Sequence, residues 1–296
     1  MTGYPHLNNS ARKALDLSID DRISYIRAPR WIGYPIALQL ISKLEDLLVY
    51  PKSHRMPNLL IVGDTNNGKT MLIQRFCKKH LSNDNLEGEA IQIPVLYIQA
   101  PPVPDEGRFY DQILERLSAA FRCTDRLGKK FSQVMTLLHG VNIKMLVIDE
   151  IHHLLAGSLN KQRGFLNVIK FIGNDLQIPI VAIGTKDAYQ ALQTEPQLAN
   201  RFEPSPLPLW RLDSEFLRLL VSFERMLPLK NPSNLSSSKL SNVIFTMTEG
   251  CIGEIAHLLV EASVLAVKSE SETIDLSILK EMNWTAPSNR IYKLAQ

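Results

Sequence analysis

Cysteine is scarce in this sequence. The three cysteines, Cys77, Cys123 and Cys251, lie far apart, and none belongs to a C-x-x-C pair. This usage is typical of reduced thiols in a cytoplasmic protein, and we expect no zinc site.

Membrane and export signals are missing as well. No stretch approaches 18 consecutive apolar residues, so the sequence predicts no membrane-spanning helix. Residues 1–18 contain no apolar segment of the kind that a signal peptide needs. We therefore expect a cytoplasmic protein with no membrane partner.

The sequence also has almost no excess of charge of one sign. Lys and Arg number 33 against 30 Asp and Glu, which gives a net charge of +3 and a pI near 8.7. This balance is too mild to predict nucleic-acid binding by itself, although it does not oppose it. The 296 residues, 45% of them hydrophobic, can build one large or two modest globular domains.

The most informative stretch is a glycine-containing loop between an apolar run and a helical pattern. The run Leu59–Val62 predicts a short buried strand, and the stretch after it, up to the first residue of the helix, reads Gly63, Asp64, Thr65, Asn66, Asn67, Gly68, Lys69, Thr70 and Met71. This is the G-x-x-x-x-G-K-T pattern of a loop that binds phosphate groups. A glycine-rich turn without a ligand is the alternative, which the preceding strand disfavours.

Each residue type in this loop suits a triphosphate. Gly63 and Gly68 let the backbone curl so that successive N–H groups point at anionic oxygens. Lys69 brings a positive charge to the β- and γ-phosphates, and the Thr70 hydroxyl is a ligand for Mg²⁺. The sequence thus predicts an ATP-type cofactor with Mg²⁺.

A second motif follows further along the chain. Residues 145–148 are four apolar residues that predict a strand buried on both faces, and Asp149 and Glu150 stand at its end. We expect Asp149 to hold Mg²⁺ opposite Thr70, and Glu150 to orient and polarise the attacking water. His152 and His153 come next; because adjacent histidines usually face apart, we expect structural or solvent-facing roles rather than metal binding.

Two more polar residues fit a site of this kind. Thr185 ends a predicted strand over residues 178–185, where its hydroxyl is suited to sense the γ-phosphate. Arg201 lies in a short segment after that strand, the position where oligomeric ATPases present an arginine finger to a neighbouring subunit. A salt-bridged surface arginine is the alternative.

The pattern divides the chain into four parts. We expect a flexible arm over residues 1–20, an α/β core with a parallel sheet over 21–204, a helical domain over 205–284 and an exposed tail over 285–296. Strand signals stop at Ser205, and four helices follow, over residues 214–225, 236–248, 253–269 and 276–282.

Two further predictions concern ligand contacts. Ile26 and Trp31, which precede the phosphate loop, either line an adenine pocket or belong to the core. The most basic loop, residues 122–130, either touches a nucleic-acid backbone through Arg122, Arg126, Lys129 and Lys130 or is a solvated charged loop.

The succession of these motifs is similar to that of AAA+ ATPases, and within them the chain resembles the TniB/TnsC family of transposition regulators, related to MuB and IstB. The resemblance covers about residues 21–282. It is carried most specifically by residues 55–70, Gly184-Thr185, Leu198-Ala199-Asn200-Arg201-Phe202, Leu227-Pro228-Leu229 and residues 249–255.

The resemblance implies an ATP-dependent adaptor in the bacterial cytoplasm. Such proteins form helical filaments or rings on double-stranded DNA, recruit and activate a DDE transposase, and often bind a target-selection partner of the TniQ type. Arg201 would be the finger acting in trans, and the helical lid near Ile252 and Gly253 would cover the nucleotide. The DNA contacts would be made to the DNA backbone and would not read bases. Arg108 joins the four basic residues named above because it lies in the corresponding region.

One position departs from the AAA+ pattern. Many AAA+ lids place an arginine after the glycine of the last motif, and here that residue is Glu254. A carboxylate cannot stabilise phosphate charge, so we expect slow turnover or dependence on partners. The alternative functions are a nucleotide-switched signalling ATPase of the STAND type and a small-molecule kinase. The length leaves no room for the long sensor domain of the former, and a kinase has less reason for a finger arginine and a lid.

Overall fold

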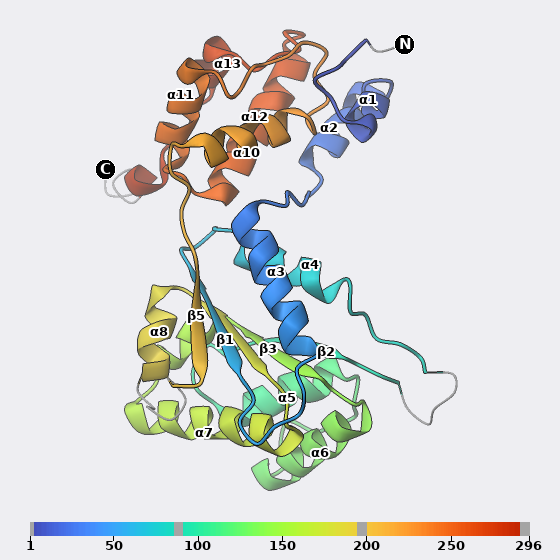
Figure 1. Cartoon of the computed structure of the whole chain (residues 1–296), viewed down its shortest axis with the longest axis vertical. Helices are drawn as coiled ribbons and strands as arrows, with labels where there is room; N and C mark the ends of the chain where they lie inside the picture. Colours follow the sequence, from blue (N-terminus) through green and yellow to red (C-terminus); the bar gives the residue numbers. More distant parts are fainter. Residues whose placement is uncertain (1–2, 86–90, 194–199, 291–296) are drawn as a thin grey trace. The chain divides into compact units, whose positions relative to one another are not determined.

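The chain folds into two compact units. The computed structural model describes residues 3–85, 91–193 and 200–290 (Figure 1). The core unit comprises Pro35–Thr65 and Lys69–Leu207, and the helical unit comprises Met1–Tyr34, Asn66–Gly68 and Pro208–Gln296.

The core unit contains a parallel five-stranded sheet. Its strands lie in the order β2-β3-β4-β1-β5, and their bounds are Val95–Gln99 (β2), Met145–Asp149 (β3), Ile180–Gly184 (β4), Asn58–Gly63 (β1) and Phe202–Leu207 (β5). All pairings are parallel, with Val62 opposite Gly184 and Gln99 opposite Asp149. The predicted α/β class is therefore confirmed, and the carboxyl ends of all five strands meet at one edge.

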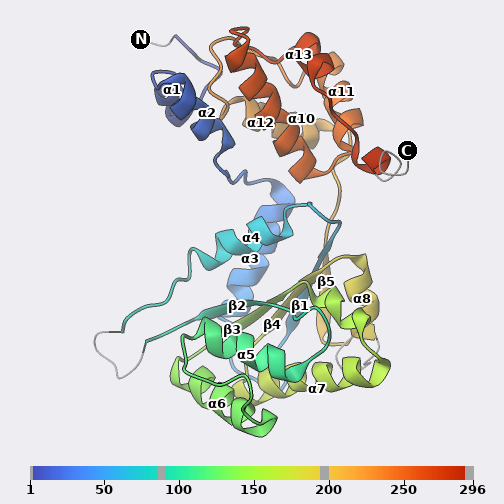
Figure 2. The same cartoon turned by 180° about the vertical axis from the view of Figure 1, so that it is seen from behind.

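Helices cover both faces of this sheet, as Figures 1 and 2 show. Right-handed crossover connections place the helix after β1 on one face and those of the later connections on the other. The first face carries α3 (Pro35–Leu48) and α4 (Lys69–Cys77); the remaining elements are α5 (Glu106–Arg116), α6 (Leu127–Gly140), the 3₁₀ helix η1 (Ile151–Ala156), α7 (Leu159–Leu176) and α8 (Lys186–Gln193).

The sequence of the strands explains their burial on both faces. Every residue of β3 and β4 is buried, as the apolar runs predict for central parallel strands. Leu60 and Ile148 pack into a core cluster with Phe109 of α5 and Phe165 of α7, while Ile73 and Phe76 of α4 are fully buried on the other side. This packing fixes the strand ends that carry the polar residues of the motifs.

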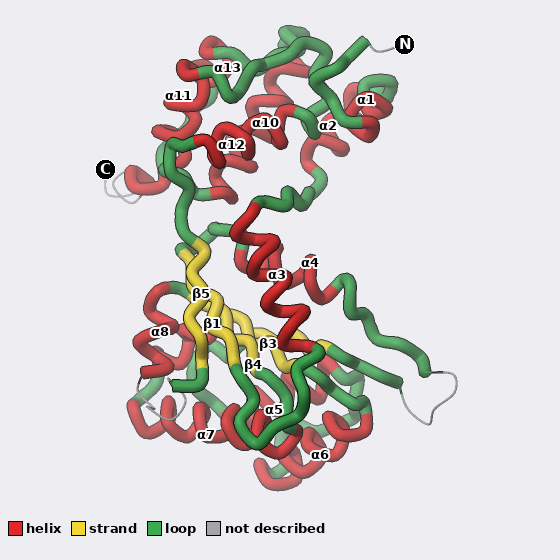
Figure 3. The backbone as a smooth tube through the Cα atoms, in the orientation of Figure 1, coloured by secondary structure: helices red, strands yellow, loops and turns green. Residues whose placement is uncertain are grey.

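The strand β5 differs from the sequence prediction. Strand signals were expected to stop at Ser205, yet Phe202–Leu207 pairs with β1 along its whole length, so a boundary at 204/205 falls inside this strand. Figure 3 shows it as a strand beside β1. It lies at the edge of the sheet, the place where a strand tolerates prolines such as Pro204 and Pro206, because the nitrogen of every second residue faces away from the one neighbouring strand.

The helical unit is built from α-helices. They are α1 (Asn9–Ala14), α2 (Ile19–Arg27), α10 (Ser214–Glu224), α11 (Ser238–Thr248), α12 (Ile252–Lys268) and α13 (Leu276–Glu281), with the 3₁₀ helix η2 (Pro287–Asn289) in the tail. Asp213 and Asp275 accept backbone hydrogen bonds at the starts of α10 and α13, which are N-caps of the ordinary kind. The four predicted C-terminal helices are present, each within a few residues of the expected ends.

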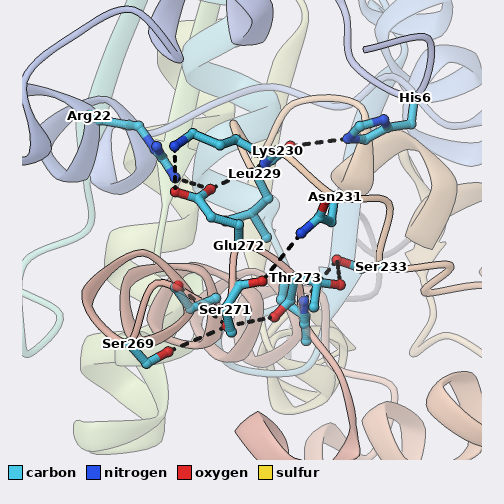
Figure 4. Close-up of polar contacts among 12 residues, drawn as sticks. His6, Arg22, Leu229, Lys230, Asn231, Ser233, Ser269, Ser271, Glu272 and Thr273 are labelled. Carbon is cyan, nitrogen blue, oxygen red and sulfur yellow. Dashed lines mark hydrogen bonds and ion pairs between the residues drawn. The ribbon is translucent and has the colours of Figure 1, made fainter. Parts of the chain in front are cut away.

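The N-terminal segment was predicted to be a flexible arm, but its described residues belong to the helical unit. The His6 ring lies 3.0 Å from the Leu229 carbonyl oxygen, and α2 packs in the same hydrophobic cluster as α12. Figure 4 shows Arg22 of α2 paired with Glu272, which also lies 3.6 Å from the Lys230 ammonium group. The His6–Leu229 and Arg22–Glu272 partners are more than 200 residues apart in the sequence, so a local pattern could not reveal them.

Among the helices of the described residues, no single one is long and apolar enough to cross a membrane. The helices α11 and α12 reach the required length and composition only as a pair, with a bend of 118° between them.

Candidate nucleotide-binding site

The phosphate loop begins where β1 and β5 approach closely. A Cβ atom on Gly63 would lie 2.9 Å from the backbone oxygen of Leu207, so only glycine fits here without a shift. Further along the loop, Asn66 and Gly68 have φ of 60° and 80°, the left-handed region that favours glycine and tolerates asparagine. The loop therefore has the curled backbone that the sequence predicts for it.

Lys69 is folded back along the loop. Its ammonium group donates hydrogen bonds of 2.9 Å to the Gly63 carbonyl and 2.7 Å to the Asp64 carbonyl, and the residue is only 7% exposed. The Asp64 carboxylate is held in turn by Lys186, 3.3 Å away. The positive charge of Lys69 is thus kept inside the loop. A bound phosphate group would replace the two carbonyl oxygens as its hydrogen-bond partner. Met71, one turn into α4, is 42% exposed.

Thr70 and Asp149 form the pair of oxygen ligands that the motifs predict for a metal ion. The Thr70 hydroxyl donates to Asp149 Oδ2 at 3.1 Å, and Tyr97 of β2 donates to the same oxygen at 2.7 Å. Burial, and next the hydrogen bond to Asp149, raise the pKa of the Tyr97 phenol, which keeps it a donor. A hydroxyl beside a buried carboxylate at the end of a phosphate loop fits Mg²⁺.

Glu150 follows Asp149 in an unusual backbone conformation. Its φ is 56°, in the left-handed region, and its N–H donates to Asp149 Oδ1 at 2.8 Å. One carboxylate oxygen of Glu150 lies 3.2 Å from His152 Nε2. The two adjacent carboxylates therefore point in different directions, one toward Thr70 and the other toward His152.

His152 and His153 do not face apart, contrary to the expectation. Their ring centroids are 4.9 Å apart, and together with Glu150 they bring three ligand atoms within 4.8 Å of one another.

Thr185 directly follows β4, so it lies at the same sheet edge as the phosphate loop. The register pairs Val62 of β1 with Gly184, the residue before it. The Thr185 hydroxyl lies 3.5 Å from a carboxylate oxygen of Asp187 in α8. The fold thus brings Lys69, Thr70, Asp149, Glu150 and Thr185 to one edge of the sheet.

Arg201 lies at the opposite edge. The backbone N–H of Asn58, the first residue of β1, donates to the Arg201 carbonyl, whereas the phosphate loop follows Gly63 at the other end of β1. The two ends of this strand are separated by about 16 Å. The Arg201 guanidinium donates to Asn174 Oδ1 of α7 at 2.6 Å. Leu198 and Ala199 of the same sequence motif lie outside the described residues.

The tip of the loop, Asn66–Gly68, makes its contacts within the helical unit. Gly253 N donates to the Asn66 carbonyl at 3.0 Å, and a Cβ atom on Gly253 would lie 2.1 Å from Asn66 Oδ1. Ile252 is the nearest neighbour of Gly68. The predicted lid residues Ile252 and Gly253 therefore contact the loop tip itself.

Glu254, the residue that departs from the AAA+ pattern, has two partners in the same unit. It accepts a hydrogen bond of 3.0 Å from the Asn66 amide and pairs with both terminal nitrogens of Arg290 in the tail. The Arg290 hydrogen bond is the main cause that lowers the pKa of the Glu254 carboxyl. Glu254 is therefore held as a carboxylate by a guanidinium that the sequence did not single out.

The two predicted base-contacting residues differ in exposure. Ile26 is fully buried in the hydrophobic cluster of the helical unit, which is the core alternative that the sequence left open. Trp31 is half-buried.

The five basic residues predicted to contact DNA also differ. Arg108, Arg122, Arg126 and Lys129 are exposed. Lys130 is buried, with its ammonium group 2.7 Å from the Asp111 carboxylate and donating to the Cys123 carbonyl at 2.8 Å. This lysine stabilises the packing of α6 on α5 and is unavailable to DNA, so including it in the footprint was wrong.

Tyr97, Asn174 and Arg290 were missed by the sequence reasoning. Each acts through a residue distant in sequence, and of the three only Tyr97 carried a signal, a polar group near the end of a predicted strand.

The comparison with protein families identifies the chain's relatives. The family model described as "Bacterial TniB protein" matches residues 22–212, which is more than half of the chain. No curated protein matches the chain.

Solved structures with a similar fold include ORC and Cdc6 proteins. The Aeropyrum pernix ORC2 protein in its ADPNP-ADP complexes is 15% identical, with a TM-score of 0.58, over 86% of this chain and 70% of that one. The Aeropyrum pernix ORC1 protein in complex with DNA is 16% identical, with a TM-score of 0.57, over 87% and 67%. Cdc6p from Pyrobaculum aerophilum is 15% identical, with a TM-score of 0.57, over 85% and 67%. At these identities the likeness establishes the fold.

Proposed function

Because the chain belongs to the TniB family, we propose that it is an ATP-dependent regulator of DNA transposition that assembles on double-stranded DNA. The chain is an AAA+ ATPase. We place it in the bacterial cytoplasm, with a DDE transposase and a TniQ-type target-selection protein as its partners in transposition.

The proposed hydrolysis depends on the groups at the carboxyl edge of the sheet. Lys69 and the loop N–H groups bind the phosphates, and Thr70 with Asp149, oriented by Tyr97, would hold Mg²⁺. The ion supplies electrostatic stabilisation of the phosphate oxygens. Glu150 orients and polarises the attacking water, and Thr185 senses the γ-phosphate.

The observation that carries the proposal of an assembly is the position of Arg201. It lies about one strand length, about 16 Å, from its own phosphate loop, too far for an arginine side chain to reach. A second copy placed head to tail would bring this guanidinium to the loop of its neighbour. Repetition of such a heterologous contact produces rings or helical filaments.

DNA contact is proposed through the exposed basic residues of the core unit. Arg108, Arg122, Arg126 and Lys129 are able to reach phosphates without reading bases. Lys129 is paired with Asp125 at 2.9 Å, a surface ion pair that a DNA phosphate could replace at low cost. Two of the structures with a similar fold contain DNA, the Aeropyrum pernix ORC1 complex and "Structure of Drosophila ORC bound to DNA".

Slow turnover is proposed from the lid. Glu254 presents a carboxylate near the loop tip, and its neutralising partner Arg290 comes from the tail rather than from α12. Brisk steady-state hydrolysis by the protein alone, without DNA or transposase, would contradict this.

Electron microscopy with duplex DNA and a non-hydrolysable ATP analogue tests the proposed function. We expect filaments or rings that coat DNA, absent for Lys69→Ala, which lacks the phosphate-binding charge. Particles that remain monomeric with both ligands present would overturn the proposal.

A salt titration of binding tests the proposed DNA contacts. Lys129→Ala should weaken DNA binding on all sequences alike and reduce the salt slope by about one phosphate contact. The matched control is Lys239→Ala, which changes an exposed lysine of the helical unit. An unchanged slope for Lys129→Ala would remove this residue from the footprint.

A further inference from the structure

Glu150, His152 and His153 form a cluster of possible metal ligands, of which the proposed hydrolysis uses only Glu150. Within the described residues each offers one ligand atom, and the three atoms lie within 4.8 Å of one another. All three side chains are partly buried. They come from four consecutive positions, where the turn of η1 brings them together.

The distances are close to those that a metal ion needs. Two nitrogen or oxygen atoms on a tetrahedral zinc ion lie about 3.3 Å apart. The Glu150 Oε2 and His152 Nε2 atoms are already 3.2 Å apart. The widest separation in the cluster must shrink by at most about 1.5 Å, which side-chain rotation can supply.

The surroundings orient the rings as in a metal site. His153 Nδ1 lies 3.3 Å from the Ala100 carbonyl oxygen, and donating to it leaves Nε2 as the nitrogen with a free lone pair. Metal-binding histidines commonly use the second nitrogen in this way. His152 Nδ1 is buried without a hydrogen-bond partner, so Nε2 is the nitrogen that faces the cluster.

We propose that Glu150, His152 and His153 bind one divalent transition-metal ion of the zinc class, separate from the Mg²⁺ site of Thr70 and Asp149. Two imidazoles and one carboxylate form a ligand set that suits zinc or cobalt and disfavours Mg²⁺, which prefers oxygen ligands and ideal octahedral geometry. Three protein ligands leave one tetrahedral position to water.

Binding would have a consequence for hydrolysis, and this part rests on the proposed role of Glu150. A carboxylate that ligates the ion can no longer polarise water. The ion would then inhibit ATP hydrolysis without preventing ATP binding, and it would prolong the ATP-bound state.

Cobalt absorption spectroscopy on tag-free, full-length protein tests binding independently of activity. We expect one Co²⁺ per chain with the intense visible bands of tetrahedral coordination, displaced by Zn²⁺ and unaffected by millimolar Mg²⁺. Loss of an outer partner of a metal site typically weakens binding by roughly 10- to 100-fold, and His153→Ala, which loses a ligand, should weaken it at least as much.

His139→Ala is the matched control. His139 also lies beside a single carboxylate, Asp175, at 3.0 Å, with no second imidazole in the pair. Its removal should leave the Co²⁺ spectrum unchanged. Absence of tetrahedral bands in the unmodified protein, or bands that survive both His152→Ala and His153→Ala, would overturn the metal site.

A measurement of ATP hydrolysis then tests the proposed inhibition separately from metal binding. Adding Zn²⁺ to one equivalent should suppress hydrolysis while a fluorescent ATP analogue still binds. Tetrahedral Co²⁺ with unchanged hydrolysis would support the metal site and contradict the role assigned to Glu150.

Discussion

The two edges of the core sheet differ in what they offer to a nucleotide. At the carboxyl edge, β1, β3 and β4 end in the phosphate loop, Asp149 and Thr185. At the amino edge, Arg201 lies beside the first residue of β1 and is held by Asn174. In a parallel sheet every strand ends at the same edge, so all the groups of the phosphate cradle lie at the carboxyl edge. The Arg201 guanidinium lies at the other edge.

One chain therefore carries both halves of the proposed site but cannot join them by itself. In the proposed assembly, the two halves meet when the amino edge of one copy faces the carboxyl edge of the next. Substitutions at the two edges should consequently affect different steps of nucleotide binding and hydrolysis.

Arg201→Ala should have the largest effect on rate. Loss of an arginine finger costs roughly 10³- to 10⁵-fold in hydrolysis, whereas nucleotide binding by the isolated chain should not change. Single-turnover hydrolysis in the DNA-bound assembly measures the rate. Arg201→Lys is the control for charge, since lysine lacks the planar fork of donors. A hydrolysis rate that is unchanged by Arg201→Ala would show that the amino edge does not contribute to hydrolysis.

Lys69→Ala should remove nucleotide binding itself. The loss of charge-assisted hydrogen bonds to phosphate costs about 3 kcal/mol or more, which is roughly 100-fold or more in affinity. Titration with a fluorescent ATP analogue measures it, and the circular dichroism spectrum checks the fold. If affinity stays near that of the unmodified chain, the carboxyl edge is not the cradle.

Tyr97→Phe should have a smaller effect confined to the carboxyl edge. It removes the donor to Asp149 Oδ2, worth about 1 kcal/mol, so the Mg²⁺ concentration for half-maximal hydrolysis should rise about fivefold. Because burial raises the pKa of Tyr97, the difference should stay constant from about pH 6 to 9. A difference that disappears as pH rises would contradict the assignment.

Asn174→Ala should have the smallest effect, confined to the amino edge. The Asn174 side chain positions the Arg201 guanidinium through one exposed hydrogen bond, worth about 0.5 kcal/mol, so hydrolysis in the assembly should fall by only about twofold. Asn174→Asp keeps an acceptor and should restore the rate. Altered nucleotide affinity in the isolated chain would show that Asn174 acts elsewhere.

The carboxyl edge could largely be predicted from the sequence, and the amino edge could not. The phosphate loop and the end of β3 are contiguous motifs whose residue types follow from phosphate and metal chemistry. The strand β5 was missed because its prolines at 204 and 206 oppose a strand until its place at the sheet edge is known. That place in turn fixes the position of Arg201 beside β1.

Long-range ion pairs account for most of the other differences between the sequence predictions and the structure. Lys130 belonged to a basic loop in the sequence, but Asp111 of the preceding helix pairs with it inside the fold. Arg22 and Glu272 are 250 residues apart and nevertheless form a pair with little exposure. Partners of this kind depend on tertiary packing, which no local pattern contains.

Mixing two inactive variants tests the central claim, a site shared between copies, most directly. Glu150→Gln lacks the water-polarising carboxylate but keeps Arg201, while Arg201→Ala keeps Glu150. In an equimolar mixture on DNA, about a quarter of the head-to-tail interfaces join an intact cradle to an intact finger, so roughly a quarter of the unmodified rate should return. A mixture as inactive as either variant alone would contradict the shared site.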